Sequence, residues 1–198
     1  AAHAAGIVHR DLKPDNIFLV ADLEQPGGER VKILDFGIAK FAEASQRELI
    51  QTRTGTLLGT PRYMSPEQCR GKRVDHRADI YALGVLAQVM LTGKPPFSGE
   101  SAVDLLLLHT TEPPPPMSRV CPDLPPELDA PVLAMLAKKP ADRPGSAGAA
   151  VAALVARARA ASHDAASHDA ASHDAAPRDT VRLAPPQAPR PSEVATVR

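Results

Sequence analysis

The chain has 198 residues, enough for one domain with a hydrophobic core, and 43% hydrophobic residues is an ordinary content for a globular protein. Lys and Arg together number 23, as do Asp and Glu, so the net charge of zero gives no field that would favour nucleic acid or an anionic membrane as a partner. Cys69 and Cys121 lack both a metal-ligand spacing and the density of a disulfide scaffold, which favours ordinary thiols in a reducing cytoplasm.

The first predicted element is a β-hairpin. Two short apolar runs, residues 17–20 and 31–34, flank the polar segment 24–29 (EQPGGE). Apolar runs separated by a Gly- and Pro-containing turn are typical of paired strands. Asn16 and Asp35 lie on the two flanks of this hairpin, so strand pairing would bring their side chains together.

Helices are predicted after residues 45–58, a polar stretch without sustained periodicity that indicates a loop. Residues 79–91 are apolar on most sides and end before Gly93, which predicts a central, buried helix too short to span a bilayer. Capping serines and flanking prolines delimit three more helices. These are expected at residues 102–109, 126–138 and 146–159. The fold class is therefore α+β, mainly α-helical with a short β-hairpin.

The C-terminal part of the chain has a biased composition. From Ala161 the pentapeptide ASHDA occurs three times, and a Pro-, Ala- and Arg-rich end follows. Three histidines recur in these repeats, but a five-residue step turns a helix by about 140°, so they share no helix face and a linker is favoured over a metal site. We expect a folded domain over residues 1–160 and a disordered tail over residues 161–198.

Motifs along the chain resemble those of protein kinases. Residues 9–16 (HRDLKPDN) and 35–37 (DFG) resemble the catalytic loop and the metal-binding motif. Residues 59–67 (GTPRYMSPE) resemble the end of the activation segment, with Ser65 where the family usually has Ala. The order of these elements extends to about Arg159. The chain resembles the C-terminal lobe of a serine/threonine protein kinase of the bacterial eukaryotic-like type.

The resemblance implies a phosphoryl transfer from ATP that depends on Mg²⁺. Asp11 would orient the substrate hydroxyl and accept its proton, and Lys13 would lie near the transferring phosphate. Asn16 and Asp35 would ligate Mg²⁺ with hard oxygen atoms. Phe18 falls where the family places an apolar side chain under the adenine. The cofactors implied are therefore ATP and Mg²⁺.

The resemblance also implies control by the activation segment. Arg10 would pair with a phosphorylated loop, for which Thr52, Thr54 and Thr56 are candidate phosphosites. For each of these threonines, a solvated loop residue without a regulatory role remains the alternative. Thr60, together with the lysine of the catalytic loop, is typical of the serine/threonine class rather than of tyrosine kinases.

Seven residues are expected to have structural roles in this family. Glu67 and Arg143 would form a buried ion pair that fixes the activation segment to the helical lobe. Asp79 would hold the backbone of the catalytic loop from below. Packing in the hydrophobic stacks of the lobe is expected for His9, Phe36, Leu86 and Met90.

The sequence before the catalytic loop lacks the Gly-rich loop, the strand lysine and the helix glutamate of a kinase N-terminal lobe. We therefore expect a kinase represented without its N-terminal lobe, and no turnover by this chain alone. A non-catalytic lobe that binds substrates or other kinases is the alternative. Expected partners are proteins with Ser or Thr acceptors, and a second kinase chain in a dimer. The expected location is the cytoplasm, and the parent protein could carry a membrane anchor.

Overall fold

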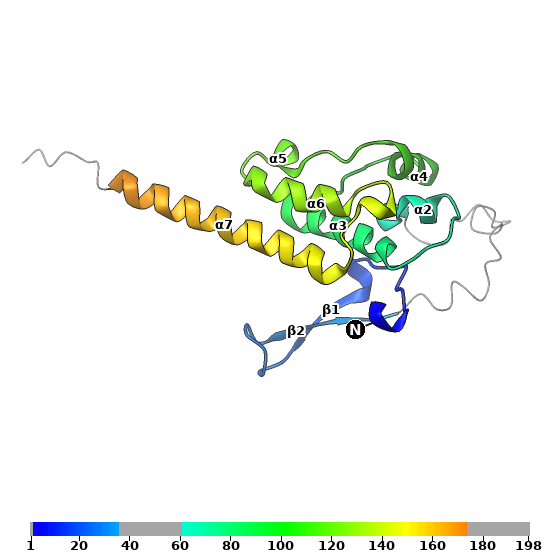
Figure 1. Ribbon diagram of the computed structural model, residues 1–198, viewed down its shortest axis with the longest axis horizontal. Coiled ribbons are helices and arrows are strands. Elements are labelled where there is room, and N and C mark those ends of the chain that lie inside the picture. The colour runs from blue at the N-terminus through cyan, green and yellow to red at the C-terminus, as the bar shows by residue number, and fades with distance from the viewer. Residues whose placement is uncertain (1, 36–60, 174–198) are drawn as a thin grey trace, which may run out of the picture. The chain divides into compact units, whose positions relative to one another are not determined.

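The computed structural model describes residues 2–35 and 61–173 of the chain, which divides into two units, Ala1–His163 and Asp164–Arg198. The helical elements and the hairpin are shown in Figure 1. In chain order the elements are the 3-10 helices η1 (His3–Ala5) and η2 (Pro14–Asn16), the strands β1 (Ile17–Ala21) and β2 (Glu29–Ile33), η3 (Pro61–Tyr63), α2 (Pro66–Cys69), α3 (Arg77–Thr92), α4 (Ala102–Thr111), α5 (Met117–Val120), η4 (Pro126–Leu128), α6 (Asp129–Met135), η5 (Pro140–Asp142) and α7 (Ala147–His173).

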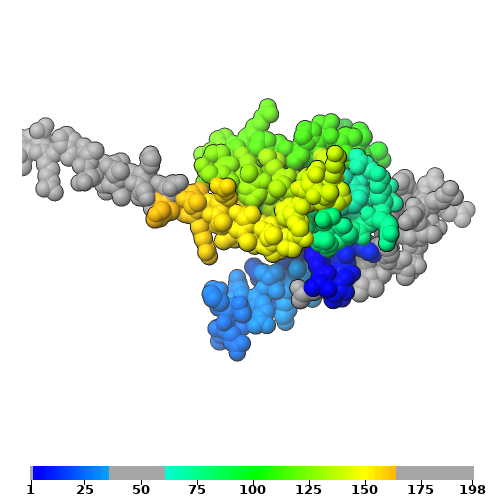
Figure 2. Space-filling model, viewed as in Figure 1, coloured from blue at the N-terminus to red at the C-terminus, as the bar shows by residue number. Residues whose placement is uncertain are grey.

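The predicted hairpin is confirmed. Strands β1 and β2 pair antiparallel, with Ile17 opposite Ile33. Gly27 and Gly28 both have positive φ in the connecting turn, a conformation that costs glycine little. The amide of Leu34 donates to the Asn16 carbonyl oxygen at 2.9 Å and continues the pairing beyond β2. The hairpin residues, blue in Figure 2, stand out below the helical body, and most of their side chains are exposed.

Helix α3 is the centre of the helical body, as its apolar sequence predicted. Ten of its residues, between Ala78 and Gln88, are buried. The helix ends at Gly93, whose φ of 70° places it in the left-handed region and whose amide donates to the Val89 carbonyl oxygen. Within the described parts of the chain, no helix is long and apolar enough to cross a membrane.

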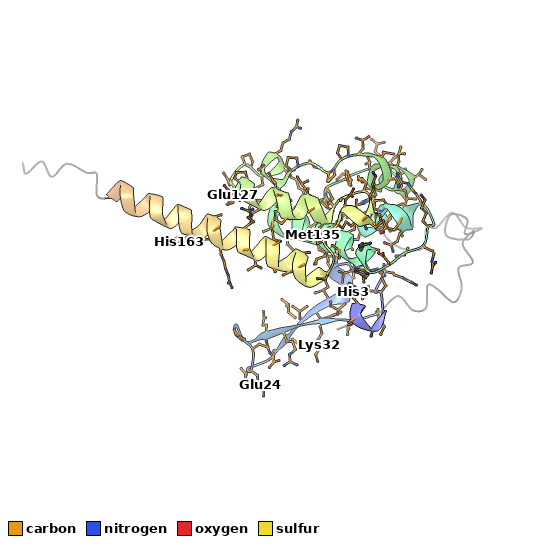
Figure 3. All side chains as sticks on the ribbon, viewed as in Figure 1. His3, Glu24, Lys32, Glu127, Met135 and His163 are labelled. Atoms are coloured by element: carbon orange, nitrogen blue, oxygen red, sulfur yellow. The ribbon has the colours of Figure 1, made fainter. Side chains whose placement is uncertain are left out.

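The hydrophobic core forms between α3, α5 and α6. Its largest fully buried apolar side chains are Ile80, Tyr81, Val85, Met117, Val132, Met135 and Leu136. Figures 1 and 3 show α3 beside α6, from which Met135 projects. The two helices meet at Gly84, where an added Cβ atom would lie 2.8 Å from the Cβ of Met135. The close approach of α3 and α6 therefore requires glycine at this position.

Helix α4 begins with the capping serine that the sequence indicated. The Ser101 hydroxyl accepts from the Asp104 amide at 3.1 Å, and the Asp104 carboxylate accepts from the Ser101 amide at 3.0 Å. The helix packs against α2 and against the turn η3. It therefore lies beside the segment that leads from η3 into α2.

Two predicted helices differ from the structure by more than two residues at one or both ends. The helix expected at residues 126–138 is split into η4 and the shorter α6, because Pro131 has no amide hydrogen and is tolerated only in a first helical turn. The helix expected to end at residue 159 continues to His173. Residues 161–173 are therefore helical rather than disordered, which the high helix propensity of their alanines explains.

The prediction that Leu86 and Met90 pack in the hydrophobic stacks of the lobe is confirmed for Leu86 and wrong for Met90. Leu86 is buried, with 3% of its surface exposed, whereas Met90 is 82% exposed. Both residues lie on α3, but the buried part of this helix ends at Gln88. Met90 lies in the last turn of α3, where its side chain is left exposed.

Replacing Gly84 by Ala should destabilise the chain. The new methyl group would meet Met135 and Leu136 at 2.8–3.1 Å, and overpacking of this kind costs about 1–3 kcal/mol, more than the roughly 1 kcal/mol that alanine gains in helix propensity. Gly148→Ala is the matched control, because a Cβ atom there meets only Ser146 Oγ, at 3.9 Å. Urea unfolding should show a lower free energy of unfolding for Gly84→Ala only. Equal stability of the two variants would contradict the close helix contact.

Candidate active site

The carboxylate of Asp79 holds the loop that carries the candidate catalytic residues. Its Oδ2 atom accepts from the backbone amide of His9 at 2.8 Å, and its Oδ1 atom accepts from the amide of Arg10 at 2.7 Å. The Nε2 atom of His3 lies 2.8 Å from the same Oδ2 atom. Figure 3 labels His3 in the first turn of the chain. A lone histidine outside a motif gave no signal in the sequence, so this third contact was missed.

The backbone at Arg10 adopts a conformation that requires support. Its φ of 67° lies in the left-handed region, which costs a non-glycine residue roughly 1–2 kcal/mol. Asp79 fixes the amide of Arg10, and the side-chain amide of Gln68 donates to its carbonyl oxygen at 2.8 Å. Both peptide groups of the strained residue are therefore held by side chains from distant parts of the sequence.

Gln68 was missed by the sequence analysis, although a local signal was present. Ser65 and Gln68 form a capping box at the start of α2, in which the Ser65 amide donates to Gln68 Oε1 at 3.0 Å. This bond occupies the amide oxygen and turns the amide nitrogen toward the catalytic loop. The Ser65 hydroxyl also donates to Gln68 Oε1, at 3.0 Å, so the serine found where related kinases usually have alanine helps to orient Gln68.

His9 joins the catalytic loop to the end of the hairpin. Its Nδ1 atom accepts from the Asp11 amide at 3.3 Å, and its Nε2 atom lies 2.9 Å from the Leu34 carbonyl oxygen. An acceptor at Nδ1 and a carbonyl partner at Nε2 assign the proton to Nε2. The imidazole thus fixes Leu34, the residue before Asp35. The φ of Asp35 is 55°, which is also in the left-handed region.

Three of the predicted site residues lie together. The Lys13 Nζ atom is 3.3 Å from the Asp11 Oδ2 atom. The Asn16 side-chain amide donates to the Asp11 backbone oxygen at 2.8 Å and approaches its Oδ2 atom at 3.4 Å. The side chains of Asp11 and Lys13 are 22% and 21% exposed, so both can be reached from solvent. A carboxylate and an ammonium group therefore stand side by side on a fixed loop.

The donor set at the base of the hairpin suits a hard cation. Asn16 precedes β1 directly, and its backbone is bonded to Leu34, next to Asp35. Because the side-chain nitrogen of Asn16 is used on Asp11, its amide oxygen is the atom directed elsewhere. An amide oxygen and a carboxylate are ligands that Mg²⁺ prefers, so Asn16 and Asp35 fit this ion.

The other predicted site residues lie on the hairpin or outside the described residues. Phe18 lies on β1 and is 46% exposed. The remaining ones lie outside the described residues, and these are Phe36, Thr52, Thr54, Thr56 and Thr60.

Glu67 and Arg143 lie in a buried network. The guanidinium donates to both Glu67 carboxylate oxygens, at 2.7 and 2.8 Å, in a bidentate arrangement. Its other donor positions reach the carbonyl oxygens of Arg77 and Ala137 at 2.9 and 2.8 Å. The group also stacks over the Tyr81 ring, 4.9 Å from its centroid. The start of α2 is thereby fixed to the segments around α3 and α6.

Both cysteines are free thiols, as the sequence indicated. Burial raises the pKa of the Cys69 thiol to about 12, so it is protonated at neutral pH and has little nucleophilic character.

Comparison with known families matches residues 1–155 to the family described as protein kinase domain. The chain therefore belongs to the protein kinase family. It is 53% identical over 149 residues to the serine/threonine-protein kinase Pkn1 of Myxococcus xanthus and 48% identical over 157 residues to pkn3 of the same bacterium. These matches cover 75% and 78% of this chain but only 21% and 28% of the two relatives. Its sequence places it among the bacterial serine/threonine kinases.

A solved structure supports the same fold. The kinase domain of PknI from Mycobacterium tuberculosis is similar to this chain with a TM-score of 0.54 and 30% identity, over 78% of this chain and 47% of that one. The predicted kinase-like fold, mainly helical with a two-stranded hairpin, is thus confirmed. The chain corresponds to about half of a kinase domain.

Breaking the Glu67–Arg143 pair should strongly destabilise the chain. Arg143→Met leaves the Glu67 carboxylate buried without its partner, which costs about 3–5 kcal/mol. The double variant Glu67→Gln/Arg143→Met removes both charges and should be more stable than Arg143→Met alone. Denaturant unfolding of the single and double variants gives the coupling energy. Additive losses would contradict a direct, buried pair.

Proposed function

We propose that this chain is the catalytic lobe of a serine/threonine kinase that transfers the γ-phosphoryl group of ATP to protein hydroxyl groups. The observation that carries the proposal is the pairing of Asp11 with Lys13 at 3.3 Å on a loop that Asp79 holds by two backbone amides. Phosphoryl transfer needs a positioned nucleophile and neutralised charge more than it needs covalent chemistry. This loop offers one group for each task.

Asp11 would act on the substrate hydroxyl. A carboxylate accepts a hydrogen bond from a serine or threonine hydroxyl, orients its oxygen toward the phosphorus and takes its proton as the new bond forms. The Asn16 side-chain amide donates to the Asp11 backbone oxygen and approaches its Oδ2 atom at 3.4 Å, which limits the movement of this carboxylate. Lys13 would place its ammonium group beside the transferring phosphoryl group and offset the negative charge there.

Asn16 and Asp35 would hold Mg²⁺ at the base of the hairpin. Bound there, Mg²⁺ would offset the negative charge of the ATP phosphates. The chain itself keeps the residues that carry the two oxygen donors close together, through the backbone bond between Leu34 and Asn16. His9 supports the same register by its contact with the Leu34 carbonyl oxygen.

The substrate class and the location are inferred from individual residue types. Lys13 and Thr60 favour Ser and Thr as acceptors over Tyr. Glu67, through Arg143, would anchor the segment that receives the substrate. Free thiols and the need for ATP favour the cytoplasm as the site of action. Because the chain spans about a fifth to a third of its relatives, the activity of the whole protein is part of the proposal.

A non-catalytic lobe that binds other proteins is the second candidate. The exposed apolar side chains of the hairpin, such as Leu19 and Val31, favour a contact with another body. The presence of Asp11, Asn16 and Asp35 together favours the catalytic function, because a lobe that only binds other proteins does not need these three residues.

Purified residues 1–198 should show no phosphorylation of a generic serine/threonine substrate, because the chain holds no Gly-rich loop and no strand lysine for the ATP phosphates.

Joining the chain to the N-terminal lobe of a bacterial serine/threonine kinase gives a complete kinase that should be active. In that protein Asp11→Asn, Asn16→Ala and Asp35→Ala should each lower kcat by orders of magnitude. Transfer of labelled phosphate from ATP to a protein substrate measures both results.

Two outcomes would count against these assignments. Turnover by residues 1–198 that Asp11→Asn abolishes would show that the N-terminal lobe is dispensable. Full activity of Asn16→Ala or Asp35→Ala in the complete kinase would remove the metal assignment. Gly148→Ala is a suitable control, since Gly148 lies in α7, far along the chain from the catalytic loop.

Regulation by phosphorylation is proposed for the segment between residues 45 and 58. A phosphate adds about two negative charges and can form about one to three charge-assisted bonds with Arg10 and neighbouring bases. In the complete kinase we expect autophosphorylation on Thr52, Thr54 or Thr56. Phosphopeptide mapping should locate it, and replacing all three threonines by Ala should lower activity without unfolding the domain. A fully active triple variant would refute this regulation while leaving the catalytic proposal intact.

A further inference from the structure

The peptide group between Arg10 and Asp11 sets the position of the candidate catalytic carboxylate. Because a peptide group is planar, a side chain that holds its carbonyl oxygen also fixes the direction in which the chain enters Asp11. The Arg10 carbonyl oxygen accepts from the Gln68 side-chain amide at 2.8 Å. On the other side of the same peptide group, the Asp11 amide donates to His9 Nδ1 at 3.3 Å. The bond from Gln68 is the shorter of these two.

The hydrogen bonds of Gln68 assign the orientation of its side-chain amide. The Oε1 atom accepts from the Ser65 backbone amide and from the Ser65 hydroxyl, each at 3.0 Å, which uses both lone pairs of that oxygen. A flipped amide would place its NH2 group against the Ser65 N–H and its oxygen against the Arg10 carbonyl oxygen. Both of these pairs are repulsive, so the nitrogen faces Arg10.

Helix α2, which carries Gln68, is itself fixed to the helical body. The carboxylate of the preceding residue, Glu67, accepts two hydrogen bonds from Arg143. The Lys72 amide donates to the Glu67 carbonyl oxygen at 2.9 Å, beyond the end of the helix. Ser65 and Glu67 are both buried. Gln68 thus reaches the catalytic loop from a helix that is held at both ends.

The residue that receives this bond has a strained backbone. The φ of Arg10 is 67°, and a residue other than glycine keeps such a conformation only where its surroundings fix it. Asp79 binds the peptide group before Arg10, and Gln68 binds the one after it. Without the Gln68 donor, the peptide group that leads into Asp11 would turn more readily.

We propose that Gln68 is a positioning residue for the transfer reaction, which donates to the Arg10 carbonyl oxygen and so places the Asp11 carboxylate for the substrate hydroxyl. Through this bond, the geometry of the catalytic loop depends on the position of α2, which begins at the end of the activation segment. The catalytic use of Asp11 rests on the proposed function, whereas the tie between Gln68 and the catalytic loop does not.

Two substitutions separate this tie from the capping of α2. Gln68→Glu keeps the capping box, in which glutamate serves a capping serine as glutamine does, but a carboxylate cannot donate to the Arg10 carbonyl oxygen. Gln68→Met keeps the length of the side chain and removes both functions. Asp104→Ala is the matched control, because Asp104 has the same place in the capping box of α4.

Amide hydrogen exchange in the 198-residue chain tests the tie. The Asp11 amide reports on the held peptide group, the Cys69 amide on α2 and the Leu136 amide on the core. Gln68→Glu should speed exchange at Asp11 about three- to tenfold, the factor that one hydrogen bond supplies. Exchange at Cys69 and Leu136 should stay within about twofold, because a negative charge at the start of α2 favours the helix. Gln68→Met should speed exchange at both Asp11 and Cys69, and Asp104→Ala at neither.

A kinetic split in the complete kinase distinguishes positioning from a structural role. Because Asp11 acts on the hydroxyl group in the transition state, Gln68→Glu should lower kcat about three- to tenfold. The KM values for ATP and for the protein substrate should stay within about twofold. A loss of folded protein would instead appear as faster exchange at Leu136.

The proposal would be overturned by a Gln68→Glu variant that matches the unchanged chain at Asp11 or in kcat, since Gln68 would then serve only to cap α2. Equal loss of protection at Asp11 and Leu136, or a raised KM with unchanged kcat, would overturn it as well. Should Gln68→Glu fail to fold, unchanged exchange at Asp11 in Gln68→Met would have the same meaning. An inactive complete kinase with intact Gln68 would refute the proposed function, and exchange at Asp11 would still decide on the tie.

Discussion

The site depends on one carboxylate buried in the helical body. Asp79, in the first turn of α3, receives the amides of His9 and Arg10 and the imidazole of His3. Without these bonds the left-handed backbone at Arg10 would relax, because such a conformation persists only when its surroundings fix it. The positions of Asp11 and Lys13 follow from that fixed backbone. The central helix therefore serves both as the core of the fold and as the support of the catalytic loop.

A second support fixes the start of α2 to the first turns of the same helix. The Arg143 guanidinium joins Glu67 at the start of α2 to carbonyl groups near α3 and α6 and stacks on Tyr81. Tyr81 in turn contacts His109 through its hydroxyl group. Gln68, one residue after Glu67, reaches back to the Arg10 carbonyl oxygen. The catalytic loop and the start of α2 are thus connected by side chains rather than by chain continuity.

Short, patterned elements could be predicted from the sequence, and contacts between distant residues could be predicted only where a motif indicated them. The hairpin and α3 follow from apolar patterning, and the contacts of Asp79 and Arg143 followed from the kinase resemblance. Pro131 delayed the start of α6 to Asp129, and alanine propensity extended α7 to His173, because local chemistry overrode the boundaries inferred from pattern. The contacts of Gln68 with Arg10 and of His3 with Asp79 span 58 and 76 residues, which no local periodicity encodes.

The central claim is that Asp79 fixes the catalytic loop, and amide exchange at His9 and Arg10 in the 198-residue chain tests it most directly. Asp79→Asn removes the charge and one acceptor oxygen, so at least one of these two amides should exchange roughly tenfold to hundredfold faster, as expected for a lost charge-assisted bond of about 1.5–3 kcal/mol. The Leu136 amide in the core should keep its protection. Unchanged exchange at both His9 and Arg10 would contradict the account.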